Sequence, residues 1–235
     1  MRELKFLSCG GALNLEMGAN CAFIKHKRNL LLIDCCEEAT RKLFNLNLFE
    51  GIENVYLALT HMHFDHVGGI GTLIWFCNFC LGFKPKIIIN SKKFKKVLMK
   101  FLKLGGVQLE LVEFVEQSEF KFDDLTLSMR STQHVDGLEC YGIMFKDNGG
   151  EYYYSGDTRD LKTIQAFNKS DNVKKIYCEV SEYDYGSHLK YEDLKTLSKD
   201  KLIFMHFNSK DLYKQIVKDG FKVAKVEKEK ICKTK

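Results

Sequence analysis

Proline is almost absent from this sequence, whose 235 residues include only one, Pro85. Turns must therefore be formed by glycine, asparagine and aspartate. The sequence also lacks a signal peptide, an apolar run of membrane-spanning length, a low-complexity linker and an internal repeat. These absences argue against a membrane protein and against a repeat array. Because 45% of the residues are apolar, the chain can bury a full core, and we expect one domain over residues 1–235.

A second cysteine pair is also missing. Cys77-X-X-Cys80 resembles half of a zinc knuckle or a redox pair, but no other pair stands at zinc-finger spacing. We therefore expect these two side chains to lie in the buried core. The nine cysteines are odd in number. Together with the missing signal peptide, this predicts free thiols and a cytoplasmic location.

No strongly charged block stands out, because the lysines are spread along the chain and the net charge is +5. This balance permits an anionic substrate without requiring nucleic acid. One lysine-rich helix is predicted over residues 91–104, with Ser91 as its N-cap. We expect its lysines to form a solvated face, with steering of an anion as the alternative.

The apolar pattern predicts two strand-rich halves with helices outside them. Strands are expected at residues 4–7, 21–24, 30–33, 55–60, 87–90, 108–115, 125–131, 141–145, 151–155, 175–178 and 201–205. Helices are expected at residues 37–48, 68–81, 91–104, 160–167, 191–197 and 209–218. This mixture indicates an α/β protein.

The densest group of potential metal ligands is His61-Met62-His63-Phe64-Asp65-His66. It follows the predicted buried strand at residues 55–60 and precedes Gly68-Gly69, whose small size lets the backbone pass close to a metal. On a tight loop, His61 and His63 can face one ion, while Asp65 and His66 face a second. Imidazoles and a carboxylate suit zinc, with manganese or iron as alternatives. A pair of such ions is the usual device for hydrolysing phosphate esters.

This His-X-His-X-Asp-His motif resembles the signature of the metallo-β-lactamase superfamily. The resemblance implies an αββα sandwich with its metal ligands on loops along one edge of the sheets. The family's remaining ligands have candidates in the expected order, namely His134, Asp157 and His206. By this resemblance, one ion is held by His61, His63 and His134, the other by Asp65, His66 and His206, and Asp157 bridges the two. A water shared by the ions would ionise near neutral pH and act as the nucleophile, since one zinc already lowers the pKa of bound water to ~7.

Further features resemble the RNase Z branch of the superfamily. They include Asn20, the strand end Ile33-Asp34-Cys35, and Tyr141, which lies seven positions after His134. His188 precedes His206 by 18 positions. RNase Z-like phosphodiesterases carry at that spacing a histidine that protonates the leaving oxygen or stabilises the scissile phosphate. Glu179 resembles the acidic residue that orients this histidine and raises its pKa toward the working range. With Asp65, these two residues, His188 and Glu179, complete the predicted catalytic set.

The interval between the third histidine and the bridging aspartate distinguishes subgroups of this branch. RNase Z enzymes that process tRNA insert a long arm there, but only 23 positions separate His134 from Asp157. The chain therefore resembles small phage and bacterial phosphodiesterases without the arm, including the anti-Pycsar family, which destroys cyclic-nucleotide immune signals.

We accordingly expect hydrolysis of a small 3′,5′-cyclic mononucleotide such as cCMP, cUMP, cAMP or cGMP. The resemblance also implies a homodimer in which the neighbouring subunit closes the substrate pocket. Two alternatives stay open: an RNase Z-like nuclease or exonuclease acting on nucleic-acid 3′ ends, and a non-catalytic scaffold of the same fold.

Overall fold

Two β-sheets form the centre of the protein, in a computed structural model that describes residues 3–184 and 186–228. The first sheet contains, in spatial order, β1 (Lys5–Ser8), β2 (Cys21–His26), β3 (Asn29–Ile33), β4 (Asn54–Ala58), β5 (Lys86–Ile89) and β6 (Glu113–Glu116). The second contains β13 (Lys222–Val223), β12 (Leu202–Phe207), β11 (Val173–Val180), β10 (Gly150–Tyr154), β9 (Cys140–Asp147), β8 (Leu125–Thr132) and β7 (Glu119–Phe122).

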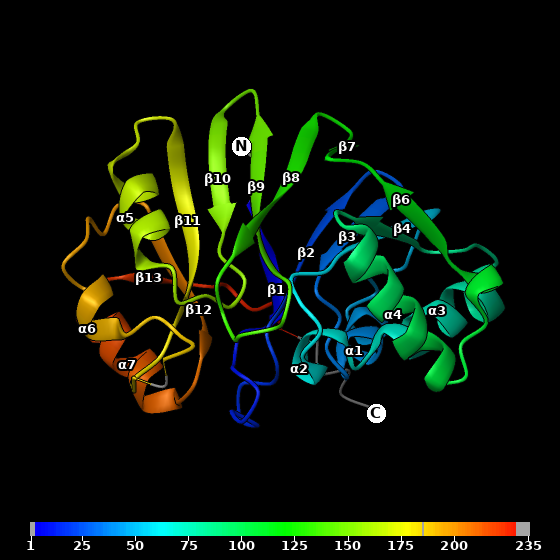
Figure 1. Cartoon of the computed structure of the whole chain (residues 1–235), viewed down its shortest axis with the longest axis horizontal. Coiled ribbons are helices and arrows are strands. Elements are labelled where there is room, and N and C mark those ends of the chain that lie inside the picture. The colour runs from blue at the N-terminus through cyan, green and yellow to red at the C-terminus, as the bar shows by residue number, and fades with distance from the viewer. Residues whose placement is uncertain (1–2, 185, 229–235) are drawn as a thin grey trace, which may run out of the picture.

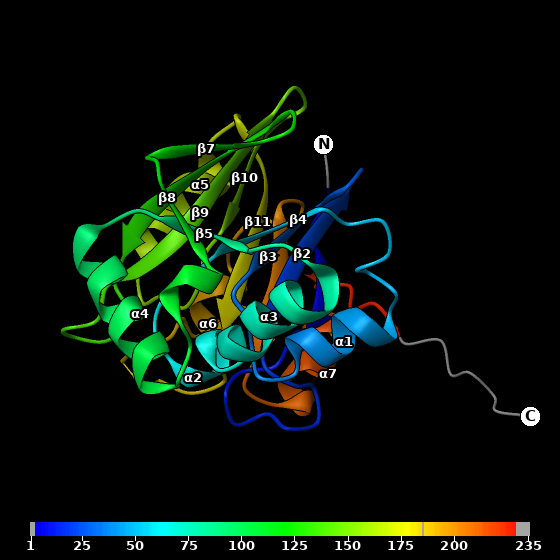
Figure 2. The same ribbon diagram turned by 90° about the vertical axis from the view of Figure 1, so that its right-hand side faces the viewer.

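Helices cover the outer face of each sheet (Figures 1 and 2). Those on the first sheet are α1 (Ala39–Asn45), α3 (Ile70–Phe76), its π-helical extension η1 (Cys77–Leu81), and α4 (Lys92–Leu104). Those on the second are α5 (Leu161–Lys169), α6 (Tyr191–Leu194) and α7 (Lys210–Lys218). Two short turns, α2 (Phe64–Val67) and the 3-10 helix η2 (Leu109–Leu111), lie in connections. The predicted αββα sandwich is confirmed.

Alternation along the strands explains why the sheets stack in this way. On β2, Ala22 and Ile24 enter the core between the sheets, whereas Cys21 and Phe23 face the helices of the outer layer. On β3, residues 31 and 33 face inward and residues 30 and 32 outward. Because successive side chains of a strand point to opposite faces, a strand that is apolar on both faces must be covered on both sides. The continuous apolar runs of the sequence therefore specify buried central strands.

Several expected elements differ in their bounds or nature. The strand predicted at residues 108–115 is wrong in its first part, because residues 109–111 form η2 and only Glu113–Glu116 pairs with β5. The helices predicted at residues 37–48 and 191–197 are shorter, and β7 and β13 were not predicted. Cys77 is buried as expected, but the expectation for Cys80 is wrong: it lies exposed on η1.

The lysine-rich helix α4 begins as predicted, because the Ser91 hydroxyl accepts hydrogen bonds from the backbone N–H groups of Lys93 and Phe94 at 3.1 Å. Its buried face contains Phe94, Leu98 and Leu102.

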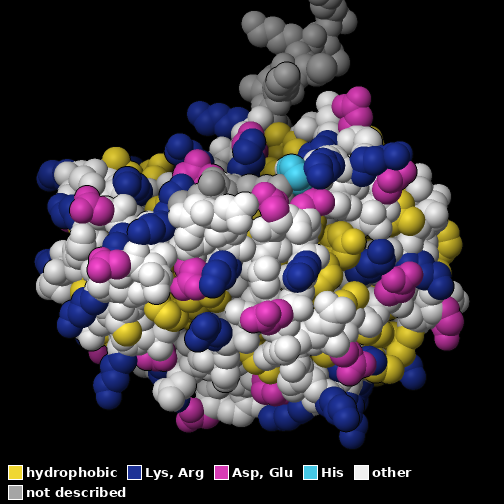
Figure 3. Space-filling model, turned by 90° about the horizontal axis from the view of Figure 1, so that it is seen from above, with side chains coloured by type: hydrophobic (Ala, Val, Ile, Leu, Met, Phe, Trp, Pro, Cys, Tyr) yellow, Lys and Arg dark blue, Asp and Glu magenta, His cyan; other side chains and the backbone are white. Residues whose placement is uncertain are grey.

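Elsewhere on the surface, positive and negative side chains are interspersed, as on the face shown in Figure 3. No helix among the described residues has the length and apolar character needed to cross a membrane.

Candidate metal centre

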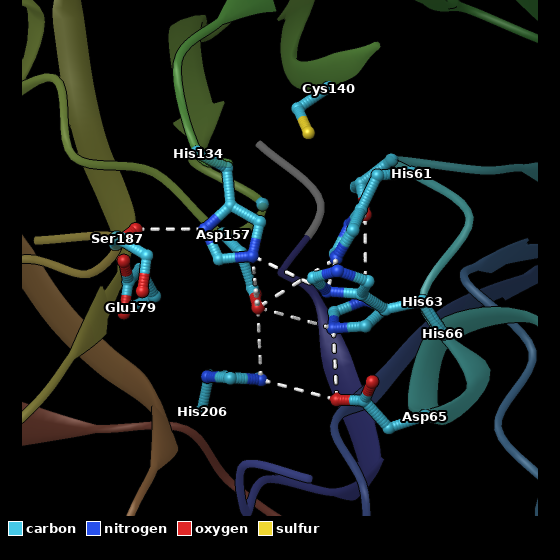
Figure 4. A network of polar contacts seen from close by, with 12 residues as sticks. His61, His63, Asp65, His66, His134, Cys140, Asp157, Glu179, Ser187 and His206 are labelled. Atoms are coloured by element: carbon cyan, nitrogen blue, oxygen red, sulfur yellow. Dashed lines mark hydrogen bonds and ion pairs between the residues drawn. The ribbon is translucent and has the colours of Figure 1, made fainter. Parts of the chain in front are cut away.

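A cluster of histidines and aspartates forms where loops from both sheets meet (Figure 4). His61 and His63 follow the end of β4, His134 follows β8, and Asp157 follows β10. In addition, Asp65 and His66 lie on α2 and His206 on β12. The cluster is therefore built from residues distant in sequence, and all seven predicted ligands come together.

The first group consists of His61, His63, His134 and Asp157, whose potential ligand atoms lie within 4.8 Å of one another. His63 Nδ1 is 3.0 Å from His61 Nε2 and 3.3 Å from His134 Nε2. Tetrahedral zinc with bonds of about 2.0–2.1 Å holds its ligand atoms about 3.3 Å apart, so these separations fit one ion. Burial lowers the pKa of His61 well below its ordinary value and also lowers that of His63, which favours the neutral, metal-binding imidazole.

The second group consists of Asp65, His66 and His206. Asp65 Oδ2 lies 3.2 Å from His66 Nε2 and 3.5 Å from His206 Nε2. Both of these ring nitrogens are buried without a hydrogen-bond partner among the described residues. A buried nitrogen left in this state is costly unless it ligates a cation, so the geometry fits a second ion.

The Asp157 carboxylate lies between the two groups. Its Oδ2 atom is 3.3 Å from His206 Nε2, 3.4 Å from His66 Nε2, 3.8 Å from His134 Nε2 and 3.9 Å from His61 Nε2. The side chain is buried, and an isolated buried carboxylate is strongly unfavourable. The buried clusters are thus consistent with a binuclear metal site in which Asp157 has the bridging position. The separate ligand roles stay predictions.

Hydrogen bonds on the far side of the rings orient them. The Asp34 carboxylate accepts from the Thr60 backbone N–H at 2.8 Å, from its hydroxyl at 3.0 Å and from His66 Nδ1 at 2.8 Å. Because the Thr60 hydroxyl donates to Asp34, its oxygen accepts from His61 Nδ1, 3.0 Å away. His134 Nδ1 donates to the Ser187 carbonyl at 2.8 Å. Each of these bonds fixes the tautomer that leaves Nε2 free to bind a metal.

Asp34 and Thr60 were not predicted as site residues. Asp34 was noticed only as part of a strand end, although its position offered a signal: an aspartate directly after a continuous apolar strand. It is fully buried and has a φ of 64°, a conformation that aspartate tolerates better than most residues. Buried charge at a strand end beside a histidine motif therefore indicates a supporting carboxylate.

His188 and Glu179 lie together beside the cluster, as expected. The His188 Nδ1–H donates to Glu179 Oε2 at 3.1 Å, and a His188 ring nitrogen lies within 4.8 Å of ligand atoms of Asp157 and His206. Burial would lower the pKa of His188, but the hydrogen bond and charge of Glu179 raise it to about 9. Protonated His188 is therefore placed to donate a proton at the edge of the cluster.

A cavity of about 560 Å³ opens over the cluster. Its floor includes His63, Asp65, Asp157 and His206, and its walls include His188 and the segments at residues 11–13, 180–183 and 208–209. This volume lies in the range of small-molecule sites. The cavity is large enough for a ligand of nucleotide size, and predicted metal ligands and His188 line it.

Replacing Asp34 with asparagine should lower zinc affinity by roughly 10–100-fold while leaving the fold intact, because the amide would disturb the tautomer of His66. Competition with a chelating dye measures the affinity, and circular dichroism checks the fold. The matched control is Asp193→Asn, which alters an exposed carboxylate of α6. Unchanged zinc affinity in Asp34→Asn would assign this residue to backbone support alone.

Comparisons with known proteins agree with this geometry. The anti-Pycsar protein Apyc1 of Paenibacillus xerothermodurans is 25% identical over 227 residues, covering 88% of each chain. The metallo-β-lactamase fold protein YhfI of Bacillus subtilis superposes with a TM-score of 0.73 at 18% identity, covering 96% of each chain. The short form of human tRNase Z superposes with a TM-score of 0.67 at 16% identity, covering 97% of each chain.

The two structural matches establish the metallo-β-lactamase fold, present here as a single domain of two mixed sheets. The match that identifies the chain more narrowly is to a family model described as "Anti-Pycsar protein Apyc1", which spans residues 2–230. With nearly the whole chain matched and its histidine and aspartate cluster in place, the chain belongs to the anti-Pycsar protein Apyc1 family.

Proposed function

We propose that the protein is a binuclear-metal phosphodiesterase that hydrolyses a 3′,5′-cyclic mononucleotide such as cCMP, cUMP, cAMP or cGMP and so counters cyclic-nucleotide immune signalling. The observation that carries this proposal is the placement of Asp157 Oδ2 within 3.3–3.9 Å of four imidazoles, at the floor of a nucleotide-sized cavity. Membership of the Apyc1 family supports the same substrate class. We propose zinc as the metal, with manganese or iron as alternatives.

The seven predicted ligands would hold two ions, which when bound supply Lewis-acid polarisation of the phosphate and an activated water. His188 lies at the side of this floor and would donate a proton to the departing ribose oxygen. Glu179 keeps the His188 ring in place through its 3.1 Å hydrogen bond and stabilises the imidazolium. The surrounding cavity walls would orient the sugar and the base and exclude water from the reacting phosphate.

The connection between His134 and Asp157 favours a small substrate over folded tRNA. It contains only the hairpin formed by β9 and β10, and β10 is paired with β9 in the sheet. No additional arm extends from this described segment (Figure 1). The protein would consequently lack remote binding energy for a tRNA, whereas a ligand enclosed in the cavity does not need it.

Turnover on a substrate panel tests the proposed function. Purified, metal-loaded protein is given 3′,5′-cyclic mononucleotides, cyclic dinucleotides, bis-p-nitrophenyl phosphate, short RNA, precursor tRNA and a β-lactam, and products are separated by chromatography. We expect opening of cyclic mononucleotides to the linear nucleoside monophosphate. Efficient 3′ trimming of precursor tRNA without opening of any cyclic nucleotide would favour the nuclease alternative, and no turnover at all would favour the scaffold.

Elemental analysis should find two transition-metal ions per chain. Asp157→Ala should lose metal and activity together, because the bridging carboxylate reduces the repulsion between the ions. Asp160, and not Asp157, caps the following helix α5, so a purely structural role of Asp157 would show as lost stability with unchanged metal content. A fully active protein with one ion per chain would refute the binuclear mechanism.

His188→Ala should retain metal but react about 10²–10⁴-fold more slowly on cyclic nucleotides, because these have a poor leaving group that needs a proton. The loss should be much smaller with bis-p-nitrophenyl phosphate, whose p-nitrophenolate leaves without one. Steady-state rates on both substrates provide the measurement. Equal losses on the two would assign His188 to phosphate binding.

We also infer a homodimer, acting in the cytoplasm. Apolar side chains stand exposed at the mouth of the cavity and beside it: the exposed fractions of Leu13, Leu15 and Phe64 are 93%, 90% and 79%. A second subunit would cover this apolar surface. Sedimentation equilibrium at micromolar concentration tests the assembly, and a monomer under these conditions would contradict it.

The proposed cytoplasmic location rests on the cysteines. The eight described cysteines are all free thiols, which suits a reducing compartment.

A further inference from the structure

One wall of the cavity carries a carboxylate and an amide side by side. Glu182 and Asn208 both line the cavity that also contains Asp65, Asp157 and His206. The two residues come from different loops, one after β11 and the other after β12, and neither belongs to the predicted metal or proton-transfer set. They are therefore positioned to contact whatever part of the substrate lies next to the phosphate.

Hydrogen bonds hold Glu182 and Asn208 in place and still leave one polar atom of each side chain without a partner among the described residues. The Glu182 backbone N–H donates to Asn208 Oδ1 at 3.0 Å, which fixes the orientation of the amide. The Ser209 hydroxyl donates to Glu182 Oε2 at 3.1 Å. The turn before Glu182 is anchored by buried Ser181, whose hydroxyl accepts from the Tyr183 N–H at 3.2 Å and donates to its carbonyl at 3.0 Å.

This arrangement leaves one acceptor and one donor. Among the described residues, Glu182 Oε1 and Asn208 Nδ2 have no hydrogen-bond partner. The smallest group that satisfies both at once is a hydroxyl, which can donate to the carboxylate and accept from the amide. A carbonyl or an amine would satisfy one of the two.

The position of the pair matches the sugar of a bound nucleotide. Asn208 lies two residues after His206, so their Cα atoms are separated by at most about 7 Å. With the phosphate at the metal cluster, the neighbouring part of a 3′,5′-cyclic nucleotide is the ribose fused to it. Its only free hydroxyl is the 2′-OH, on the carbon next to the one that carries the 3′-oxygen of the phosphate ring.

Building on the proposed function, we propose that Glu182 and Asn208 bind the ribose 2′-hydroxyl and make the enzyme selective for cyclic ribonucleotides over cyclic 2′-deoxyribonucleotides. Glu182 is exposed and Asn208 half-buried, so the discrimination arises from two hydrogen bonds, one of them to a charged group, that the analogue without the hydroxyl cannot form. The 2′-hydroxyl is also the group by which proteins distinguish ribonucleotides from deoxyribonucleotides.

The test compares kcat/KM for 3′,5′-cAMP and 2′-deoxy-3′,5′-cAMP. The same comparison of ribonucleotide and deoxyribonucleotide is made with the other bases. We expect the wild type to prefer the ribonucleotide by about 100-fold. Glu182→Gln and Asn208→Asp are isosteric and keep the contacts to Ser209 and to the residue 182 backbone N–H. Each should reduce kcat/KM for the ribonucleotide about 10–100-fold, since hydrogen bonds to charged groups are the stronger ones, and leave the deoxyribonucleotide nearly unchanged. Glu192→Gln, an exposed glutamate on α6, is the matched control.

The double variant Glu182→Gln with Asn208→Asp exchanges the donor and the acceptor. A hydroxyl can pair with either arrangement. The preference of the double variant for the ribonucleotide should therefore be at least tenfold higher than that of either single variant. If the pair instead contacted the base, whose donors and acceptors are fixed in place, exchange would give no recovery and the preference among bases would change. That result would overturn the ribose assignment.

Two further outcomes separate this inference from the function on which it rests. A wild type that opens ribo- and deoxyribonucleotides equally well would contradict the ribose assignment and leave the proposed function standing. A wild type that opens neither would contradict the proposed function, and the ribose assignment with it. Metal content and thermal melting of each variant confirm that any loss arises from the pocket wall.

Discussion

The close approach of one buried carboxylate and the imidazole nitrogens around it is the constraint on which the site depends. Asp157 is almost fully buried, and the four nearest ring nitrogens come from three separate parts of the chain: His61 and His66 from one, His134 from the second and His206 from the third. Without cations, burying these imidazole nitrogens beside two carboxylates would destabilise the folded protein. With cations they become a ligand set, so metal binding and the closure of this edge of the sandwich stabilise each other.

The geometry of the sheets supplies the positions for this ligand set. The run from β3 to β5 is parallel, so β3 and β4 end at the same edge, where Asp34 and Thr60 meet. On the other sheet, β11 and β12 are also parallel, and Glu179 and His206 lie near their ends. A Cβ on Gly69 would lie 2.1 Å from the Cys36 carbonyl, so the metal loop can pack this closely only because that residue is glycine.

Local chemistry explains which parts of this structure could be predicted from the sequence. The histidine motif, the Ser91 cap and the central strands each depend on neighbours in the chain, and the structure contains them with small shifts in bounds. Asp34, by contrast, acts through a hydrogen bond to His66 across 32 positions, and Glu182 through Asn208 across 26. Such pairs depend on how strands are ordered in a sheet, which periodicity does not specify. The short strands β7 and β13 were missed for a similar reason: they gain stability mainly from pairing.

Glu179 links two segments of the site that are distant in the sequence. Its Oε1 atom accepts from the backbone N–H groups of Thr158 and Leu189, at 3.0 and 3.1 Å, while Oε2 holds His188. Thr158 directly follows Asp157 and Leu189 directly follows His188, so Glu179 binds the chain beside both residues. One carboxyl group therefore connects the segment that carries the predicted bridging ligand with the segment that carries the predicted proton donor. A displacement of Glu179 would therefore shift both segments, so the spacing between Asp157 and His188 depends on this one side chain.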